Sequence, residues 1–379
     1  MKNIKEILPG IFAGLIFLAG CESEAVRKPP VTESENLNNL LAHAPISWIN
    51  LNGVKVDTIF VPAEHIYEES LFVDNSLYVS QPTQLKTFSN HLITTDFVPG
   101  FVGSGNLVAT GRNGIPVRTI GRSGQGPGEY VRPIAVMSNG THLYIYDDGL
   151  KRVNVFDAEF SLVDTFEFTD AVNYKNRMKM NESYMAYQNR TATGLIAIDP
   201  DGYLLSVRPL ADIDSVIFRA MPRIVPTGMQ PGVYNNILIS MNSHSEMLTG
   251  YLGLPYLFLY RDFQHTNTIV LESVQIDTTN NPSLRPTPPV GSSGVGISGI
   301  LSHILLHDNS DILISSFRQL HHLKSNPNGG FGHYRTYCLI REDTGEQITT
   351  IREIDFFPDD PNRIYALGWG FLYEFRLPE

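Results

Sequence analysis

Short apolar runs alternate with turn-forming residues along most of this chain, and that rhythm constrains its fold most strongly. From Leu51 onward, runs of roughly four to eight apolar residues are separated by Gly, Asn, Asp and Pro, which is typical of strands and turns. Turn formers are abundant, with 31 glycines and 24 prolines, and so are strand formers, with 17 tyrosines and 20 phenylalanines. Because 42% of the residues are hydrophobic and only 18% charged, disorder over most of the chain is excluded. The pattern predicts an all-β protein.

A hairpin-like pair of runs recurs along the chain. Residues 153–156 and 162–168 align without a gap on residues 195–198 and 204–207, at an offset of 42 residues. Looser copies pair the following runs: 257–260 with 268–271, and 337–340 with 347–351. A unit of about four short strands that recurs every 40 to 60 residues or so is typical of a β-propeller.

Counting these units gives a six-bladed ring over residues 48–379. Five blades are expected near residues 64–121, 128–170, 173–212, 217–275 and 297–356. The sixth is expected to combine both ends of the chain, with residues 362–366 and 371–376 as inner strands and residues 54–61 as the outer strand. An N-terminal strand that joins the C-terminal blade would close the ring, because pairing removes open sheet edges.

The N-terminus reads as an export signal. Lys2 and Lys5 precede an apolar run over residues 7–20, which is shorter than the roughly 20 residues that span a bilayer. Residues 1–20 are therefore expected to be a cleaved signal peptide.

The residues that follow the apolar run resemble a bacterial lipobox: Leu18, Ala19, Gly20 and Cys21. The resemblance implies cleavage before Cys21 and lipidation of its thiol. Residues 21–47 are expected to form a flexible tether in which Leu37, Leu40 and Leu41 allow one helical turn at most. We expect the lipid to hold the protein at the outer membrane or cell surface, with a periplasmic orientation as the alternative.

Cysteine content and charge narrow the classes of partner. Once Cys21 carries lipid, Cys338 has no partner for an intramolecular disulfide, and we expect it to be a buried strand residue. With 28 basic and 39 acidic residues, the net charge is -11, whereas nucleic-acid binding requires a basic footprint. Nucleic acid is not an expected partner, and an envelope protein or a glycan is.

The glycine-rich segment at residues 120–130 reads IGRSGQGPGEY. A phosphate-binding loop would need a helix after it, whereas Pro127, Glu129 and the strand pattern that follows oppose one. We interpret the segment as a connection between blades that uses glycine for positive φ angles. Its polar residues are candidates for one face of the ring: Arg122, Gln125, Glu129 and Arg132.

Three stretches carry a family resemblance. Residues 120–130, then 143–148 (LYIYDD), then 151–157 (KRVNVFD) resemble an NHL-type repeat. Together with the lipobox, they make the chain similar to the TolB-like six-bladed β-propeller lipoproteins of Gram-negative envelopes. The resemblance implies the fold and the location and no defined activity, and the other expected blades lack the glycine-rich run.

Asp147, Asp148 and Arg152 fall at the ends of adjacent strands in the most regular repeat. They could bind a polar ligand, but we favour the interpretation that they pair with each other and tie the hairpin. His321 and His322 lie next to each other on an expected strand, so they point to opposite faces and are poorly placed to share a metal with His333.

Two further segments are candidates for contacts with a ligand. Trp369, Phe371 and Tyr373 alternate along a strand, which fits either a sugar-stacking platform or the core between blades, and we favour the core. Residues 276–299, which are rich in Thr, Asn, Pro, Ser and Gly, are expected to form a surface loop.

The leading functional hypothesis is a membrane-tethered propeller that binds a ligand or a protein at the envelope without catalysis. No nucleophile–base pattern is evident in the sequence. The alternative is a hydrolase or lyase with Ca²⁺ in the central channel, for which no spacing identifies the ligands. A purely structural role in an envelope assembly is the third possibility.

Overall fold

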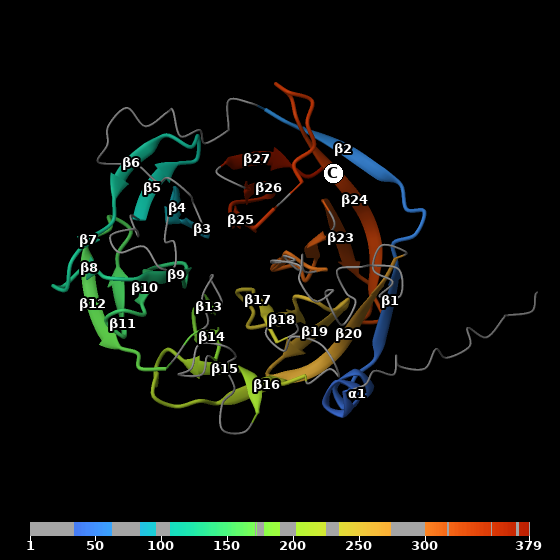
Figure 1. The fold of residues 1–379 in the computed structure, drawn as a ribbon, viewed down its shortest axis with the longest axis horizontal. Helices are drawn as coiled ribbons and strands as arrows, with labels where there is room; N and C mark the ends of the chain where they lie inside the picture. The colour runs from blue at the N-terminus through green and yellow to red at the C-terminus, as the bar shows by residue number, and fades with distance from the viewer. Residues whose placement is uncertain are drawn as a thin grey trace, which may run out of the picture.

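A computed structural model describes the chain over eleven ranges. They are residues 34–62, 84–95, 107–170, 172, 178–189, 202–224, 235–273, 300–316, 318–349, 351–368 and 371–378. Over these residues the protein is all-β with one short helix, and six small sheets surround a central axis (Figure 1). The predicted six-bladed β-propeller is therefore confirmed.

The first three blades follow one another along the chain, each with four strands. Blade one contains β3 (Gln84–Phe88), β4 (His91–Thr95), β5 (Leu107–Gly111) and β6 (Pro116–Thr119). Blade two contains β9 (Pro133–Ser138), β10 (Leu143–Asp147), β11 (Arg152–Phe156) and β12 (Leu162–Glu167). Blade three contains β13 (Met178–Met180), β14 (Tyr184–Gln188), β15 (Tyr203–Pro209) and β16 (Phe218–Pro222). A small parallel pair, β7 (Arg122–Ser123) with β8 (Glu129–Tyr130), lies between blades one and two.

The last three blades complete the ring. Blade four contains β17 (Ile237–Met241), β18 (Met247–Tyr251), β19 (Tyr256–Arg261) and β20 (Gln264–Glu272). Blade five contains β21 (His303–Leu306), β22 (Ile312–Ser316), β23 (Gln319–Ser325) and β24 (Phe331–Arg341). Blade six contains β25 (Glu353–Phe357), β26 (Asp360–Leu367) and β27 (Leu372–Arg376). In each blade the strands pair antiparallel in chain order, and the first strand lies nearest the axis.

Two N-terminal strands form outer fifth strands on blades four and five. β1 (Ile46–Asn50) pairs in parallel with β20, and β2 (Val56–Val61) pairs in parallel with β24. The prediction that residues 54–61 complete the C-terminal blade is therefore wrong. The hydrogen bonds of β2 go to blade five, while its buried Ile59 and Val61 pack in one apolar cluster with Phe375 and Leu377 at the end of the chain.

Blade six is formed entirely by the C-terminal part of the chain. The strands predicted at 362–366 and 371–376 exist as β26 and β27, but they are the second and third strands of the blade. Its innermost strand is β25, which the sequence interpretation had placed at the end of blade five. These strands were assigned to wrong positions because alternating apolar residues occur in every strand. The alternation does not tell whether a strand is the first, second or third of its blade.

The alignment at an offset of 42 residues matches strands that differ by one position within their blades. Residues 162–168 contain β12, the fourth strand of blade two, whereas residues 204–207 lie in β15, the third strand of blade three. Blade three therefore extends to β16, past its predicted end at residue 212 and into the range predicted for blade four. The copy at 257–260 and 268–271 does correspond to third and fourth strands, namely β19 and β20. Residues 195–198 lie outside the described residues.

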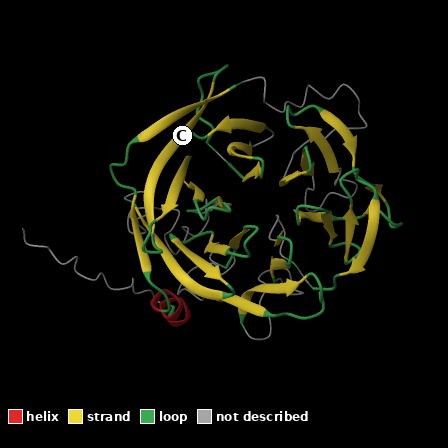
Figure 2. Cartoon of the chain, turned by 180° about the vertical axis from the view of Figure 1, so that it is seen from behind, coloured by secondary structure: helices red, strands yellow, loops and turns green. Residues whose placement is uncertain are grey.

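The helix α1 (Glu35–Ala42) packs against the rim of the ring (Figure 2). The Ser34 side chain caps it by accepting a hydrogen bond from the Leu37 N–H, with 3.4 Å between Oγ and N. Leu37 and Leu41 are buried in an apolar cluster with residues of blades three and four. The helix is thus longer than the single turn expected from the sequence, because the leucine face is buried by tertiary packing. In the described ranges, no helix has the length and apolar character to cross a membrane.

Cys338 lies in β24, as the strand prediction requires, and it is half-buried instead of fully buried. Partial burial raises the pKa of its thiol.

We expect β1 to contribute strongly to stability. Ile49 is 1% exposed and belongs to the cluster between blades four and five, so Ile49→Ala should lower the free energy of unfolding by about 2–5 kcal/mol. Phe60→Ala on β2 is the control. The Phe60 side chain is 61% exposed, so this substitution should lower the free energy of unfolding by less than about 0.5 kcal/mol. Urea unfolding measures both variants. Equal effects would show that β1 is not part of the core.

Candidate binding site in the central channel

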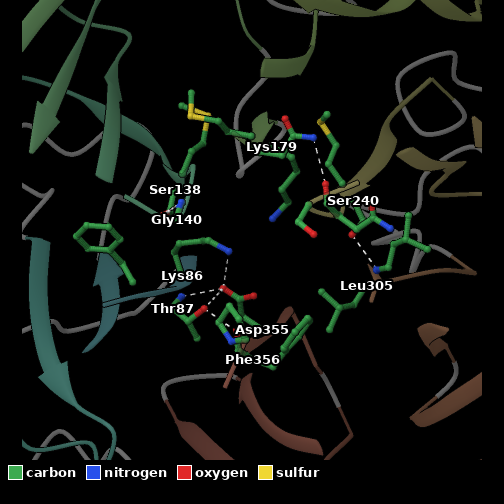
Figure 3. Close-up of a pocket in the computed structure, with 18 of the residues that line it drawn as sticks. Lys86, Thr87, Ser138, Gly140, Lys179, Ser240, Leu305, Asp355 and Phe356 are labelled. Carbon is green, nitrogen blue, oxygen red and sulfur yellow. Dashed lines mark hydrogen bonds and ion pairs between the residues drawn. The ribbon is translucent and has the colours of Figure 1, made fainter. Parts of the chain in front are cut away.

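The innermost strands of all six blades enclose a cavity of about 400 Å³ on the axis of the ring (Figure 3). Each blade contributes residues from its first strand and from the turn that follows. One lining residue from each blade, in chain order, is Lys86, Ser138, Lys179, Ser240, Leu305 and Asp355. The volume falls in the range of small-molecule sites in proteins.

Asparagine residues shape the rim of this cavity. Asn139, Asn181 and Asn242 each follow the innermost strand of their blade, and each side-chain oxygen accepts N–H bonds from its own turn. The amide of Asn181 also donates to the Asn242 carbonyl (3.1 Å), and the amide of Asn242 donates to the His307 carbonyl (3.2 Å). All three side chains therefore close their turns, and those of Asn181 and Asn242 also join neighbouring blades.

Asp355 is the most constrained carboxylate that lines the cavity. Its side chain lies where blade six meets blade one, and the residue is only 7% exposed. Oδ2 accepts hydrogen bonds from the Thr87 N–H (2.7 Å), the Thr87 hydroxyl (3.1 Å) and the Lys86 ammonium (2.9 Å). Three donors on one oxygen fix the orientation of the carboxylate.

The other oxygen of Asp355 is oriented toward the cavity. Among the residues that the structure describes, Oδ1 receives no hydrogen bond. Figure 3 shows this carboxylate and the side chains of Lys86 and Lys179 directed into the same space. The channel therefore presents a fixed acceptor beside cationic donors.

A second cavity, of about 220 Å³, lies between blades five and six. His322 and Asp311 pair there with 3.1 Å between Nε2 and Oδ2, and the His307 ring stacks on Phe356 with 4.3 Å between centroids. Burial lowers the pKa of His307 to about 4, so this ring is neutral at pH 7. Within the described ranges, no group of three or more His, Cys, Asp or Glu side chains is arranged to hold a metal ion.

The seven residues singled out in the sequence lie elsewhere, around the β7–β8 pair and the neighbouring strands of blade two (Figure 1). Arg122 Nε contacts Glu129 Oε1 at 2.6 Å, and the other oxygen of Glu129 accepts the Gly126 N–H at 2.7 Å. The Gly126 N–H and the Arg122 guanidinium lower the pKa of Glu129. Gln125 contributes its backbone carbonyl, which accepts a hydrogen bond from the Arg152 guanidinium.

Asp147 and Arg152 lie opposite each other at the ends of β10 and β11, and the side chains of Asp147, Asp148 and Arg152 each contact residues outside this group. Asp147 is fully buried and accepts four backbone N–H groups, those of Val131, Arg132, Gly149 and Leu150. Asp148 pairs with Arg132 and Lys151. Arg152 donates to the carbonyls of Gly126 and Glu129.

These side chains therefore do act as a tie, as we favoured, but through partners that the sequence analysis did not name. Carbonyls of the glycine-rich loop bind Arg152, backbone N–H groups of neighbouring turns bind Asp147, and Arg132 and Lys151 pair with Asp148. None of the seven residues is among those that line the channel cavity. A ligand-binding role for them remains a prediction.

The interpretation of the glycine-rich run as a connection between blades is confirmed, since it joins β6 to β9. Gly121 has φ +67°, and a Cβ there would lie 2.3 Å from Cε2 of Tyr130 and 2.4 Å from the Gly128 carbonyl. Both the backbone angle and the close packing require glycine at this position.

The remaining predictions concern three histidines, the aromatic residues near the C-terminus and the loop at 276–299. His322 binds Asp311, while His321 and His333 both contact the Thr336 hydroxyl at 2.9 Å, so adjacent histidines do have separate partners. Tyr373 belongs to an apolar cluster of blades five and six and Phe371 packs against it, which confirms the core interpretation for these two. Trp369 and the predicted loop at 276–299 lie outside the described residues.

Comparison with known proteins supports the fold and assigns no family. No protein-family model and no curated protein sequence matches the chain. Among solved structures, a protein from Bacteroides fragilis described as exported aligns with a TM-score of 0.52 at 12% identity, over 88% of this chain and 100% of that chain. At this identity the similarity shows a shared fold alone.

Two further structures align at lower scores. A member of the DUF4221 family from Bacteroides vulgatus gives a TM-score of 0.47 at 10% identity, covering 85% of this chain and 97% of that one. Virginiamycin B lyase from Staphylococcus aureus gives 0.43 at 9% identity, covering 81% and 83%.

Two glycine substitutions test the account of the blade connection. Gly121→Ala should cost about 2–5 kcal/mol of unfolding free energy, because a left-handed backbone angle and a clash with Tyr130 act together. Gly114→Ala is the matched control: φ is +76° but nothing lies within 4 Å of the new Cβ, so only about 1–2 kcal/mol should be lost. Thermal and urea unfolding provide the comparison. A Gly121→Ala variant as stable as Gly114→Ala would contradict the packing described here.

Proposed function

We propose that this chain is an exported, lipid-anchored propeller that binds a ligand in its central channel and does not transform it. One observation carries this proposal: polar groups from all six blades converge on one cavity of about 400 Å³. A ring that served only as a scaffold would gain more from an apolar axis, since buried polar groups cost free energy unless they are fully hydrogen-bonded. The unused oxygen of Asp355 is the clearest of these groups.

The environment of Ser138 and Ser240, two of the hydroxyl residues that line the channel, favours binding over nucleophilic catalysis. Ser138 Oγ accepts the Gly140 N–H, and Ser240 Oγ accepts the Leu306 N–H of the next blade. In the described part of the chain, neither hydroxyl is hydrogen-bonded to a histidine, which is the partner that activates serine in most hydrolases. These hydroxyls instead stabilise the turns and the contacts between blades.

Export and lipid anchoring are supported by the N-terminal sequence. Lys2, Lys5 and the apolar run precede the lipobox-like residues that end at Cys21. The similarity in fold to a protein described as exported is consistent with that location. An outer-membrane or cell-surface position, with an envelope protein or glycan as the natural ligand, is part of the proposal.

Blocking the mouth of the channel should abolish ligand capture. Ser243 is an exposed rim residue that lines the cavity, so Ser243→Trp should obstruct entry while the rest of the fold remains intact. Saturation-transfer NMR against a library of monosaccharides, amino acids and short peptides would identify ligands of the natural protein. Their affinity should fall by about tenfold or more in Ser243→Trp. In Glu159→Trp, a control at an exposed turn of blade two, it should not change. Ligands that bind both variants equally would place binding elsewhere.

Lipidation should depend on one cysteine. When the full chain is expressed in a Gram-negative host, we expect it in the membrane fraction with lipid attached at the mature N-terminus, as intact mass would show. Cys21→Ser should move it to the soluble fraction or leave it unprocessed, whereas Cys338→Ser should behave like the natural chain. Membrane attachment that survives Cys21→Ser without a lipid mass would refute the anchor.

A further inference from the structure

The charges of the described residues around the channel cavity nearly balance. Among these residues, two lysines, Lys86 and Lys179, and three carboxylates, Glu182, Asp308 and Asp355, line it, so two positive charges face three negative ones. Lys86 is already paired with Asp355 at 2.9 Å. An anionic ligand would find no excess of positive charge, and a strongly cationic one would find little excess of negative charge. The balance favours a neutral, polar ligand.

The hydrogen-bonding groups at Asp355 and Lys86 match a pair of hydroxyls. Oδ1 of Asp355 is an acceptor with no hydrogen bond among the described residues. Beside it, the Lys86 ammonium has three N–H donors, of which one is used by Asp355. A hydroxyl group both donates and accepts, so one hydroxyl can donate to Oδ1 while an adjacent one accepts from Nζ.

The site is preorganised around this pair. Asp355 is more than nine-tenths buried, and Thr87 fixes its other oxygen through both backbone and side chain. Apolar residues line the cavity beside this carboxylate, among them Ile354 and Phe356. A fixed charged acceptor beside apolar residues suits a molecule that has hydroxyls at its edge and C–H groups on its faces.

We propose that the channel ligand is a neutral carbohydrate, two adjacent hydroxyls of which bind Asp355 Oδ1 and Lys86 Nζ. This inference rests on the proposed function, since it names the ligand class for the same cavity. Of the two partners expected from the sequence, it selects the glycan over the protein.

Asp355→Asn separates recognition from structure. The asparagine oxygen can still accept the Thr87 N–H, while its NH₂ group replaces the acceptor that faces the cavity with a donor. Lys86→Met is the second variant, and it leaves the hydrogen bonds between Thr87 and Asp355 in place. Asp164→Asn, at an exposed position on β12, is the control with the same change in charge. Circular dichroism and thermal unfolding would establish that each variant folds.

The probe is an array of neutral, sialylated, uronic-acid and sulfated oligosaccharides, with calorimetry on each glycan that binds. We expect a neutral glycan to bind the natural protein and Asp164→Asn alike, with affinity about tenfold or more weaker in Asp355→Asn and Lys86→Met. Binding of a neutral glycan that neither variant weakens would overturn the proposal.

The remaining outcomes separate this inference from the proposed function. Binding of acidic glycans alone would also overturn the inference. So would the absence of glycan binding together with channel-dependent binding of amino acids or peptides in the NMR screen, and that result would leave the proposed function standing. No channel-dependent ligand in either experiment would refute both.

Discussion

Two carboxylates of β25, together with an apolar cluster that joins blades one and six, close the ring. In the part of the chain that the structure describes, no strand pairs the last blade with the first, so the seam is held by side chains. Glu353 accepts the Leu85 N–H at 2.8 Å, and Asp355 accepts the Thr87 N–H at 2.7 Å, each across the seam. Charge-assisted hydrogen bonds to a backbone strand are among the stronger polar contacts in proteins. The same strand thus closes the ring and lines its channel, so binding geometry and fold stability share Asp355.

The N-terminal strands reinforce a different part of the ring. β1 and β2 extend blades four and five in parallel, and α1 packs against blades three and four. Side chains of β2 then reach the end of blade six in a shared apolar cluster. From Ser34 onward, the N-terminal segment is therefore part of the folded body.

Strand rhythm alone was enough to predict the fold class and the number of blades, but not the rank of each strand. Residues 204–207 and 162–168 have the same local pattern, yet they are third and fourth strands of their blades, because rank is decided by contacts distant in sequence. The partner of β2 was missed for the same reason. The channel was not predicted either, since each blade contributes only a few lining residues. An asparagine that recurs directly after the innermost strand, at positions 139, 181 and 242, is a sequence signal that could have indicated it.

The contrast between the glycine-rich loop and the channel shows what distinguishes a binding site from a structural network. Asp147 and Arg152 are densely hydrogen-bonded, but their partners are the N–H and C=O groups of their own loop and turn. A ligand would have to displace these contacts, and leaving a buried group unpaired costs about 1–3 kcal/mol. Asp355 satisfies its structural partners with one oxygen and leaves the other facing the cavity. Unused hydrogen-bonding capacity on a fixed side chain, more than charge density in the sequence, therefore marks the channel as the site.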